Sequence, residues 1–214
     1  MVKHKGIWIC VSGIDGSGKT TVCKHIMTVL GKNSKFMKIP YFDWVRDMIK
    51  ISGNNSPTED RYTDALIFAA GSRLEMYYID EFLGNNKYLV TQRCWLDNFP
   101  YRIAQGYSLK EAMDILRPEQ FIKPDVIFFL KYDYRRAYEG IKNDNGDKYE
   151  TLDQIKIHEM EFDKMYDDIR ANNFPIKFPN TKIVMIDTSK PLNEVKKEVT
   201  EKLEELNLSF SEEW

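Results

Sequence analysis

Cysteine is scarce in this sequence, and long apolar runs are missing. The 214 residues include only three cysteines, Cys10, Cys23 and Cys94, which are too few and too far apart to predict a disulfide framework or a zinc site. No apolar run approaches the roughly 20 residues that a membrane-spanning helix needs, and the first residues lack the apolar segment of a secretory signal peptide. We therefore expect reduced thiols in a cytoplasmic protein that does not enter a membrane.

An excess of charge of either sign is missing as well. The 31 Lys and Arg residues are balanced by 33 Asp and Glu residues, and no stretch gathers the basic ones into a stripe. Without such a stripe we do not expect duplex nucleic acid as a partner. The length and the 43% apolar content suffice for one sizeable core, so the chain is expected to form a single domain over residues 1–214.

A glycine-rich run is the most informative feature present. Residues 13–21 read GIDGSGKTT, and they follow the apolar residues 7–11 and precede a helical pattern. Glycines at these positions let successive backbone N–H groups turn toward phosphate oxygens, Lys19 can reach the β- and γ-phosphates, and Thr20 can offer its hydroxyl to Mg²⁺. The run is typical of a P-loop, and the alternative is a glycine turn without a ligand. The predicted nucleotide-binding residues are Gly13, Asp15, Gly16, Ser17, Gly18, Lys19, Thr20 and Thr21.

Strand-like and helical runs alternate along the rest of the chain. This alternation predicts an α/β fold, with a doubly wound five-stranded parallel sheet flanked by helices and the P-loop at the carboxyl edge of the first strand. A long helix is expected over residues 58–83, with a cap at or near Thr58 and an end at Gly84, and a lid at about residues 140–150. The other expected strands cover residues 36–39, 88–91, 126–130 and 183–186, and the other expected helices residues 18–30, 150–171 and 192–206.

Three motifs in this order resemble the thymidylate kinase family. The first is the P-loop run, the second is LIFAA at residues 66–70 followed by Arg-Leu-Glu at 73–75, and the third is KPDVIFFL at 123–130. The resemblance covers about residues 5–205. It implies a P-loop nucleoside-monophosphate kinase that uses ATP and Mg²⁺ to phosphorylate a pyrimidine deoxynucleoside monophosphate, with dTMP converted to dTDP as the expected reaction. It also implies a homodimer formed through the helix at residues 60–83.

The resemblance assigns roles around the acceptor. Phe68 would stack on the acceptor base, Arg93 would bridge the acceptor and donor phosphates, and Asp15 would accept a hydrogen bond from the sugar 3′-hydroxyl. Asn98 or Gln105 would contact the base.

The register of Arg73, which by the resemblance would hydrogen-bond the base edge, departs from the family pattern. This arginine follows Phe68 by five residues, whereas the family has it four residues on. On a regular helix five residues correspond to a turn of about 140° away from Phe68. Either Ser72 takes the place of the arginine, or a π-bulge within residues 69–73 restores the register, and we predict the bulge.

Other positions depart from the family as well. Gln92 stands where the family has an aspartate near Mg²⁺, with Asp97 and Asp15 as possible substitutes. The expected lid contains no arginine, so Lys142 and Lys148 are the predicted catalytic cations beside Lys19 and Arg93, with Arg135 and Arg136 as further candidates.

The acceptor phosphate raises a separate question. Phe42 replaces an arginine that would grip this phosphate, and Arg46 is the nearest basic residue. These departures leave two alternatives open: a kinase for a deoxynucleoside or a modified pyrimidine nucleotide, and a nucleotide-binding pseudo-kinase or regulatory protein.

Overall fold

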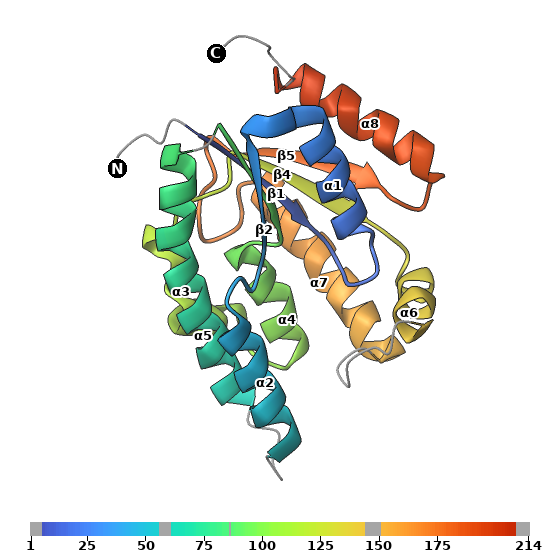
Figure 1. Ribbon diagram of the computed structural model, residues 1–214. Coiled ribbons are helices and arrows are strands. Elements are labelled where there is room, and N and C mark those ends of the chain that lie inside the picture. Colours follow the sequence, from blue (N-terminus) through green and yellow to red (C-terminus); the bar gives the residue numbers. More distant parts are fainter. Residues whose placement is uncertain (1–5, 56–60, 86, 144–150, 209–214) are drawn as a thin grey trace.

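A five-stranded parallel sheet forms the centre of the structure, a computed structural model that describes residues 6–55, 61–85, 87–143 and 151–208, without the side chains of residues 52–55 and 143 (Figure 1). The strand order is β2-β3-β1-β4-β5, and each neighbouring pair is parallel. The predicted fold class is thus confirmed. The strands are β1 (Ile7–Ser12), β2 (Ser34–Lys38), β3 (Tyr88–Gln92), β4 (Val126–Lys131) and β5 (Lys182–Asp187).

Helices cover both faces of this sheet. In Figure 1, α1 and α8 lie on one face, and α3, α4, α5 and α7 lie on the other. None of the helices in the described ranges is long and apolar enough to cross a membrane. The helices are α1 (Lys19–Leu30), α2 (Asp43–Asn55), α3 (Arg61–Asn85), α4 (Asn98–Ala104), α5 (Leu109–Leu116), α6 (Tyr134–Asn143), α7 (Leu152–Arg170) and α8 (Leu192–Glu205).

The alternation of side chains along β1 divides the interior into two layers. Ile9 and Val11 pack with the residues of α1 and α8, whereas Trp8 and Cys10 pack with the residues of α3, α4, α5 and α7. Successive side chains of a strand point to opposite faces, so a strand buried on both faces must be apolar throughout. This explains why residues 7–11 form one continuous apolar run in the sequence.

Two expectations about the long helix are wrong. The helix α3 is a continuous α-helix from Arg61 to Asn85, so it contains no bulge at residues 69–73, and it passes through Gly84 instead of ending there. The helix packs closely on α2 at this point, because a Cβ on Gly71 would lie 2.8 Å from Cγ2 of Val45 in α2. Ser72 therefore takes the position one turn after Phe68. The expected cap at Thr58 lies outside the described residues.

The strand order reverses at β1, with β3 on one side and β4 on the other. In open parallel sheets, ligands bind beyond the carboxyl ends of the strands at such a point. The loops that follow β1 and β3 carry the P-loop glycines and Arg93, so the topology brings these predicted site residues to one edge of the sheet. The expected lid falls largely on residues 144–150, which lie outside the described residues.

Candidate active site

The P-loop connects β1 to α1 through glycines with left-handed backbone conformations. Gly13, Gly16 and Gly18 have φ angles of 142°, 80° and 85°, which residues with a Cβ rarely adopt. The loop also lies directly against α6, because a Cβ on Gly16 would come within 2.7 Å of the carbonyl oxygen of Ala137. The loop thus presents the N-terminus of α1, whose N–H groups and dipole favour an anion.

Lys19 is buried at the start of α1, with its ammonium held over the P-loop. Its Nζ donates to the carbonyl oxygens of Gly13 at 2.9 Å and Ile14 at 2.5 Å, and lies 3.6 Å from Oδ1 of Asp15. Burial lowers the pKa of Lys19 to about 8. The negative charge of Asp15 opposes this shift, and the positive charge of Arg93 adds to it. An anionic phosphate at this place would restore the usual preference for the charged form.

Thr20 and Gln92 meet at the position expected for the metal. Thr20 Oγ1 donates to Oε1 of Gln92 at 2.9 Å, so the end of β3 does contact the P-loop hydroxyl. Asp97 has another use. Its carboxylate oxygens accept from Ser12 Oγ and from the backbone N–H of Cys94, each at 2.9 Å, and burial raises its pKa. Asp97 thus ties the end of β1 to the loop after β3, which corrects the suggestion that it could replace a metal-binding aspartate.

Asp15 joins the P-loop to Arg93 and to Tyr101 of α4. Arg93 forms an ion pair with Oδ1 of Asp15, and Tyr101 Oη donates to Oδ2 at 2.7 Å. Arg93 also donates to Tyr101 Oη at 3.3 Å, which closes the network. Arg93 has a φ of 72°, an unusual angle for a residue other than glycine, and its N–H donates to Val11 O of β1 at 2.9 Å. Such backbone conformations concentrate at functional sites.

The network fixes the charges of its members. Burial by itself would raise the pKa of Asp15, but the charges of Arg93 and Lys19 and the Tyr101 hydroxyl outweigh it and hold this pKa well below its usual range. Burial would lower the pKa of Arg93, yet Asp15 raises it. Asp15 is therefore a carboxylate and Arg93 a guanidinium at any physiological pH. Sequence reasoning missed Tyr101, because nothing local distinguishes it from a core tyrosine.

The helices α3 and α4 contact each other through two polar or charged pairs. Asn98 Nδ2 donates to Ser72 Oγ at 3.2 Å, and the guanidinium carbon of Arg102 lies 5.1 Å from the centre of the Phe68 ring. Phe68 and Asn98, both predicted as base-site residues, therefore lie on facing helices. Arg102 was not predicted, although it is the one charged residue of α4 and could have drawn attention for that reason.

Arg73 lies elsewhere. Its Nη2 donates to the carbonyl oxygens of Leu116 at 3.2 Å and Arg117 at 3.0 Å, and its guanidinium lies 5.4 Å from the Phe121 ring centre. Because α3 is a regular helix, Arg73 points about 140° away from Phe68. The expectation that Arg73 contacts the base is corrected here: this side chain satisfies carbonyl groups at the C-terminal end of α5.

Gln105 lies at the C-terminal end of α4. Its carbonyl oxygen accepts from Nη1 of Arg61 at 2.9 Å, and its side-chain Oε1 is buried. The backbone of Gln105 thus has a structural role, and its predicted contact with a base stays a prediction.

His158 of α7 faces the same region from a third helix. Its ring centre lies 4.6 Å from that of Tyr101, in an edge-to-face arrangement. Burial lowers the pKa of His158 to about 4; Asp15 opposes this shift, whereas Arg93 and Arg102 add to it. The imidazole is thus neutral near pH 7. Its distance in the chain from every motif explains why the sequence did not indicate it.

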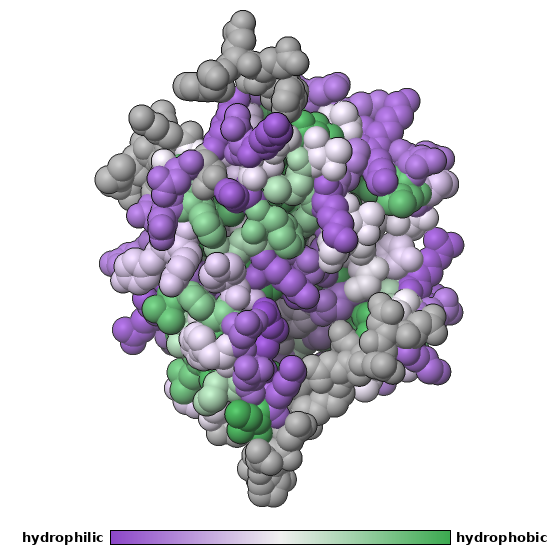
Figure 2. Space-filling view, viewed as in Figure 1, coloured by the Kyte–Doolittle hydropathy of each residue, from purple (hydrophilic) through white to green (hydrophobic). Residues whose placement is uncertain are grey.

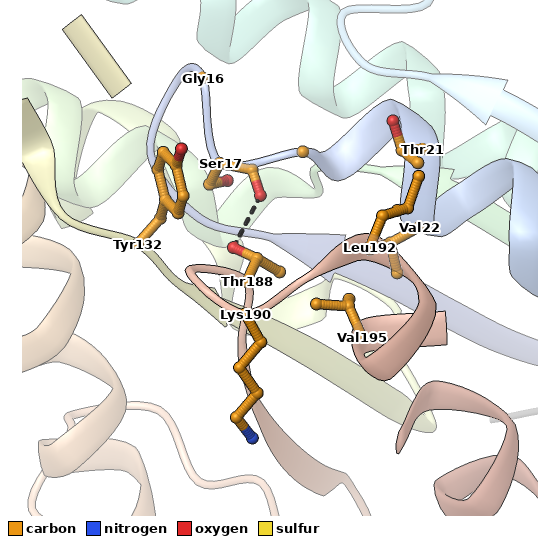
Figure 3. Close-up of a pocket in the computed structure, with 10 residues that line it drawn as sticks. Gly16, Ser17, Thr21, Val22, Tyr132, Thr188, Lys190, Leu192 and Val195 are labelled. Atoms are coloured by element: carbon orange, nitrogen blue, oxygen red, sulfur yellow. Dashed lines mark hydrogen bonds between the residues drawn. The ribbon is translucent and has the colours of Figure 1, made fainter. Parts of the chain in front are cut away.

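A pocket lies on the other side of the P-loop, between α1 and α8 (Figure 3). Thr188, which follows β5, donates through Oγ1 to the carbonyl oxygen of Ser17 at 2.9 Å, so this loop and the P-loop are joined. The pocket can receive the part of a nucleotide that extends away from the phosphates. Its lining also includes Gly16, Gly18, Thr21, Val22, Tyr132, Lys190, Leu192 and Val195.

The predicted lid cations are only partly within the described residues. Lys142 is exposed near the end of α6, and Lys148 lies outside those residues. Of the further candidates, Arg136 donates to the carbonyl oxygen of Ser189 at 3.4 Å, between two residues that line the pocket, Thr188 and Lys190, and Arg135 packs on Tyr134.

Arg46 contacts its own segment of chain. It donates to the carbonyl oxygen of Pro40 and forms an ion pair with Asp43. Phe42, at the position where the family has an arginine, packs edge-to-face against Tyr78 with ring centres 5.2 Å apart. Arg46 is thus engaged by its own segment, and Phe42 carries no charge that could bind an acceptor phosphate.

Taken together, a P-loop at the switch point of a parallel sheet and a half-buried arginine that shares the Asp15 carboxylate with the P-loop lysine define a P-loop phosphotransferase. The comparison with known proteins then names the family. A family model described as thymidylate kinase matches residues 11–199, and the chain belongs to the thymidylate kinase family. The expected resemblance is thereby confirmed.

Individual relatives agree with this assignment. A thymidylate kinase of Shewanella amazonensis is 24% identical over 209 residues, covering 93% of this chain and 96% of that one, and a thymidylate kinase of Blochmanniella floridana is 27% identical over 202 residues, covering 88% and 90%. The solved structure of thymidylate kinase from Candida albicans matches the fold with a TM-score of 0.69 at 20% identity, covering 95% of this chain and 93% of that one.

Proposed function

We propose that this protein transfers the γ-phosphoryl group of ATP to dTMP, giving dTDP and ADP. A phosphate oxygen of the acceptor attacks the γ-phosphorus, and the bond to the bridging oxygen of ADP breaks in line with it. The observation that carries the proposal is the network of Lys19, Asp15, Arg93 and Tyr101. It sets two cations between the P-loop and α4, where the phosphates of donor and acceptor must meet.

Charge neutralisation and positioning supply the catalysis in this proposal. Lys19 contacts the β- and γ-phosphates, and Arg93 bridges the γ-phosphate and the acceptor phosphate with a guanidinium that stays charged. Asp15 exchanges its contact with Tyr101 or Arg93 for the sugar 3′-hydroxyl. Lys142 and Lys148 approach the transferring group from the lid, in place of an arginine.

ATP and Mg²⁺ are the proposed cofactors. Residues 13–21 cradle the phosphates, and the pocket of Figure 3 holds the base of ATP between α1 and α8. Thr20 Oγ1 and Oε1 of Gln92 are neutral oxygen ligands at the place where the metal is expected, a donor set that suits a hard cation which keeps its own water and phosphate ligands. Bound Mg²⁺ would neutralise charge on the β- and γ-phosphates.

The assembly and location complete the proposal. We expect one domain over the whole chain, a homodimer through the exposed face of α3, and action in the cytoplasm. Three buried free cysteines, Cys10, Cys23 and Cys94, support a reducing compartment.

The first test is an acceptor panel. Purified protein is incubated with ATP and Mg²⁺ and with thymidine, dTMP, dUMP, dCMP and the purine deoxynucleoside monophosphates, while ADP and each product are measured. We expect dTMP to give the highest kcat/KM, with one dTDP per ADP. Lys19→Met should lower kcat by about 10²-fold or more, because it removes a preorganised charge from the phosphates.

Two other outcomes would replace this function. Preferred turnover of thymidine would identify a deoxynucleoside kinase, which the contacts of Arg46 with Pro40 and Asp43 favour. Binding of ATP without any product would identify a pseudo-kinase, which the neutral amide of Gln92 favours.

A further inference from the structure

The interface of α3 and α4 aligns two pairs of side chains that lie one helical turn apart. Phe68 contacts Arg102 and Ser72 contacts Asn98, so the two helices run in opposite directions past each other. Residues four apart lie on one face of a helix. The four side chains thus form a single surface, with an aromatic ring and a guanidinium at one end and an amide and a hydroxyl at the other.

Arg102 is buried, with only 6% of its surface exposed. Charged side chains are seldom so buried unless they have partners, and one partner of the Arg102 guanidinium is the ring of Phe68. Tyr101, the preceding residue, donates a hydrogen bond to Asp15 of the P-loop. The charges of Arg93 and Arg102 both contribute to the lowered pKa of His158 in α7. The contact with Phe68 places Arg102 on the side of α4 that faces α3, the same side as Asn98, one residue after the tyrosine proposed to lie beside the sugar and phosphate of the acceptor.

Arg73 is excluded from this region by its own contacts. Its guanidinium donates to two carbonyl oxygens at the end of α5 and packs on Phe121. Moving it to Phe68 would break these contacts and would require a different helical register in α3. The arginine that faces Phe68 comes from α4.

We propose that Arg102, and not Arg73, selects the base of the acceptor nucleotide, and that it favours bases with carbonyl oxygens on the edge it meets. This inference rests on the proposed function and specifies its base preference. The base stacks on Phe68, and the long Arg102 side chain carries its guanidinium from the ring face to the edge of the base. Asn98 and Ser72 lie one turn further along and complete the polar edge.

The chemistry of the guanidinium determines which bases are preferred. It has five donor N–H groups and no acceptor. Thymine and uracil present carbonyl oxygens at positions 2 and 4, whereas cytosine carries an amino group at position 4 that would set donor against donor. An arginine at this edge therefore favours dTMP and dUMP over dCMP, and such a contact is worth about 10- to 100-fold in discrimination.

The test compares Arg102→Gln, Arg102→Lys and Arg73→Gln in the intact protein, using kcat/KM for dTMP, dUMP and dCMP. Glutamine can turn its amide to donate or to accept, so Arg102→Gln should reduce the preference for dTMP over dCMP by about 10- to 100-fold. Arg102→Lys keeps the charge without the fork and should be intermediate. Arg73→Gln should keep the preference within about twofold while lowering the melting temperature, because it uncaps α5.

The opposite pattern, in which Arg73→Gln loses the preference and Arg102→Gln keeps it, would overturn the inference. ATP binding and melting temperature show whether each variant is folded. If Arg102→Gln does not fold, the dTMP preference of Arg102→Lys is compared with that of Arg73→Gln, and a larger loss in Arg73→Gln would overturn the inference. If the unmodified protein turns over no monophosphate, the proposed function fails. The inference is then tested separately by measuring the affinities of the same variants for dTMP and dCMP by calorimetry. An equal loss of affinity for both nucleotides in Arg102→Gln would count against it.

Discussion

Glu75 is a carboxylate buried beneath the loop that follows β2. Its Oε1 accepts from the backbone N–H of Tyr41 at 2.8 Å, and among the described residues no group donates to Oε2. Burial raises the pKa of Glu75 from 4.5 to about 7, and the hydrogen bond from Tyr41 only partly opposes this. The native structure therefore favours the neutral acid, and this residue couples stability to pH in the physiological range.

Replacing Glu75 by glutamine should remove this coupling. Because the pKa is higher in the folded state, the contribution of Glu75 to stability is complete below pH 4.5 and is lost as the pH rises through about 7. At 1.36 kcal/mol per pH unit, the loss amounts to at most about 3 kcal/mol. Denaturant unfolding at pH 5 and pH 8 should thus show Glu75→Gln more stable than the unmodified protein at pH 8 and similar at pH 5.

Glu81→Gln provides the control for this measurement. Glu81 is an exposed glutamate of the same helix, so its replacement should leave the pH dependence as it is. Equal pH dependence of the Glu75→Gln variant and the unmodified protein would contradict the argument.

At the scale of elements, the contact between the P-loop and α6 leaves no room for a side chain at the position after Asp15. Gly16 combines a φ of 80° with backbone atoms of Ala137 at 2.7 and 2.9 Å from the position of a Cβ. Any side chain there would have to displace α6. The same contact ties the P-loop to the helix that leads into the proposed lid.

Gly16→Ala and Gly18→Ala distinguish the cost of a strained backbone conformation from the cost of steric overlap with α6. Both glycines have a positive φ, but a Cβ on Gly18 meets no atom of the described structure within 4 Å. Gly18→Ala should therefore cost about 1–2 kcal/mol of conformational strain, and Gly16→Ala about 1–3 kcal/mol more, because it overpacks α6. The measurement is denaturant unfolding without nucleotide. Equal destabilisation by the two substitutions would show that the contact with α6 is not tight.

At the scale of the whole molecule, apolar side chains remain on the surface of α2 and α3. Figure 2 shows hydrophobic residues at the surface over these helices. On α3, Tyr62, Leu66, Leu74 and Tyr77 follow a helical spacing, and Tyr77 is 75% exposed. A surface of this kind on a single chain is typical of an interface, which supports the proposed homodimer through α3.

Tyr77→Arg should weaken this dimer. A charge within an apolar contact must lose its water without gaining a partner, so sedimentation equilibrium should show a shift from dimer to monomer. Met160→Arg, at a residue of α7 that is 59% exposed, is the matched control and should leave the mass unchanged. A monomeric unmodified protein, or a dimer insensitive to Tyr77→Arg, would contradict the proposal.

Several features of the site could be predicted from the sequence because they are local. The P-loop needs its glycines, Lys19 and Thr20 within nine residues, and the place of Gln92 near the loop agrees with two parallel strands that end at one edge of the sheet. The five-residue step from Phe68 to Arg73 left two alternatives open, a regular helix with Ser72 beside Phe68 or a bulge that restores Arg73, and the bulge was predicted. The predicted bulge was wrong, because α3 is a continuous α-helix, and so were the predicted end of this helix at Gly84 and the contact of Arg73 with the base that the bulge would have allowed.

By itself, the sequence determined the family, the parallel sheet and the phosphate-binding loop, since these depend on short-range spacing and on alternating patterns. Only the tertiary structure decided that Tyr101, Arg102 and His158 face the proposed acceptor region, from helices far from the P-loop in the chain. It also decided that Arg73 does not. Which of two arginines reaches an aromatic ring depends on how α3 and α4 pack together, and that packing is set by contacts between residues distant in sequence.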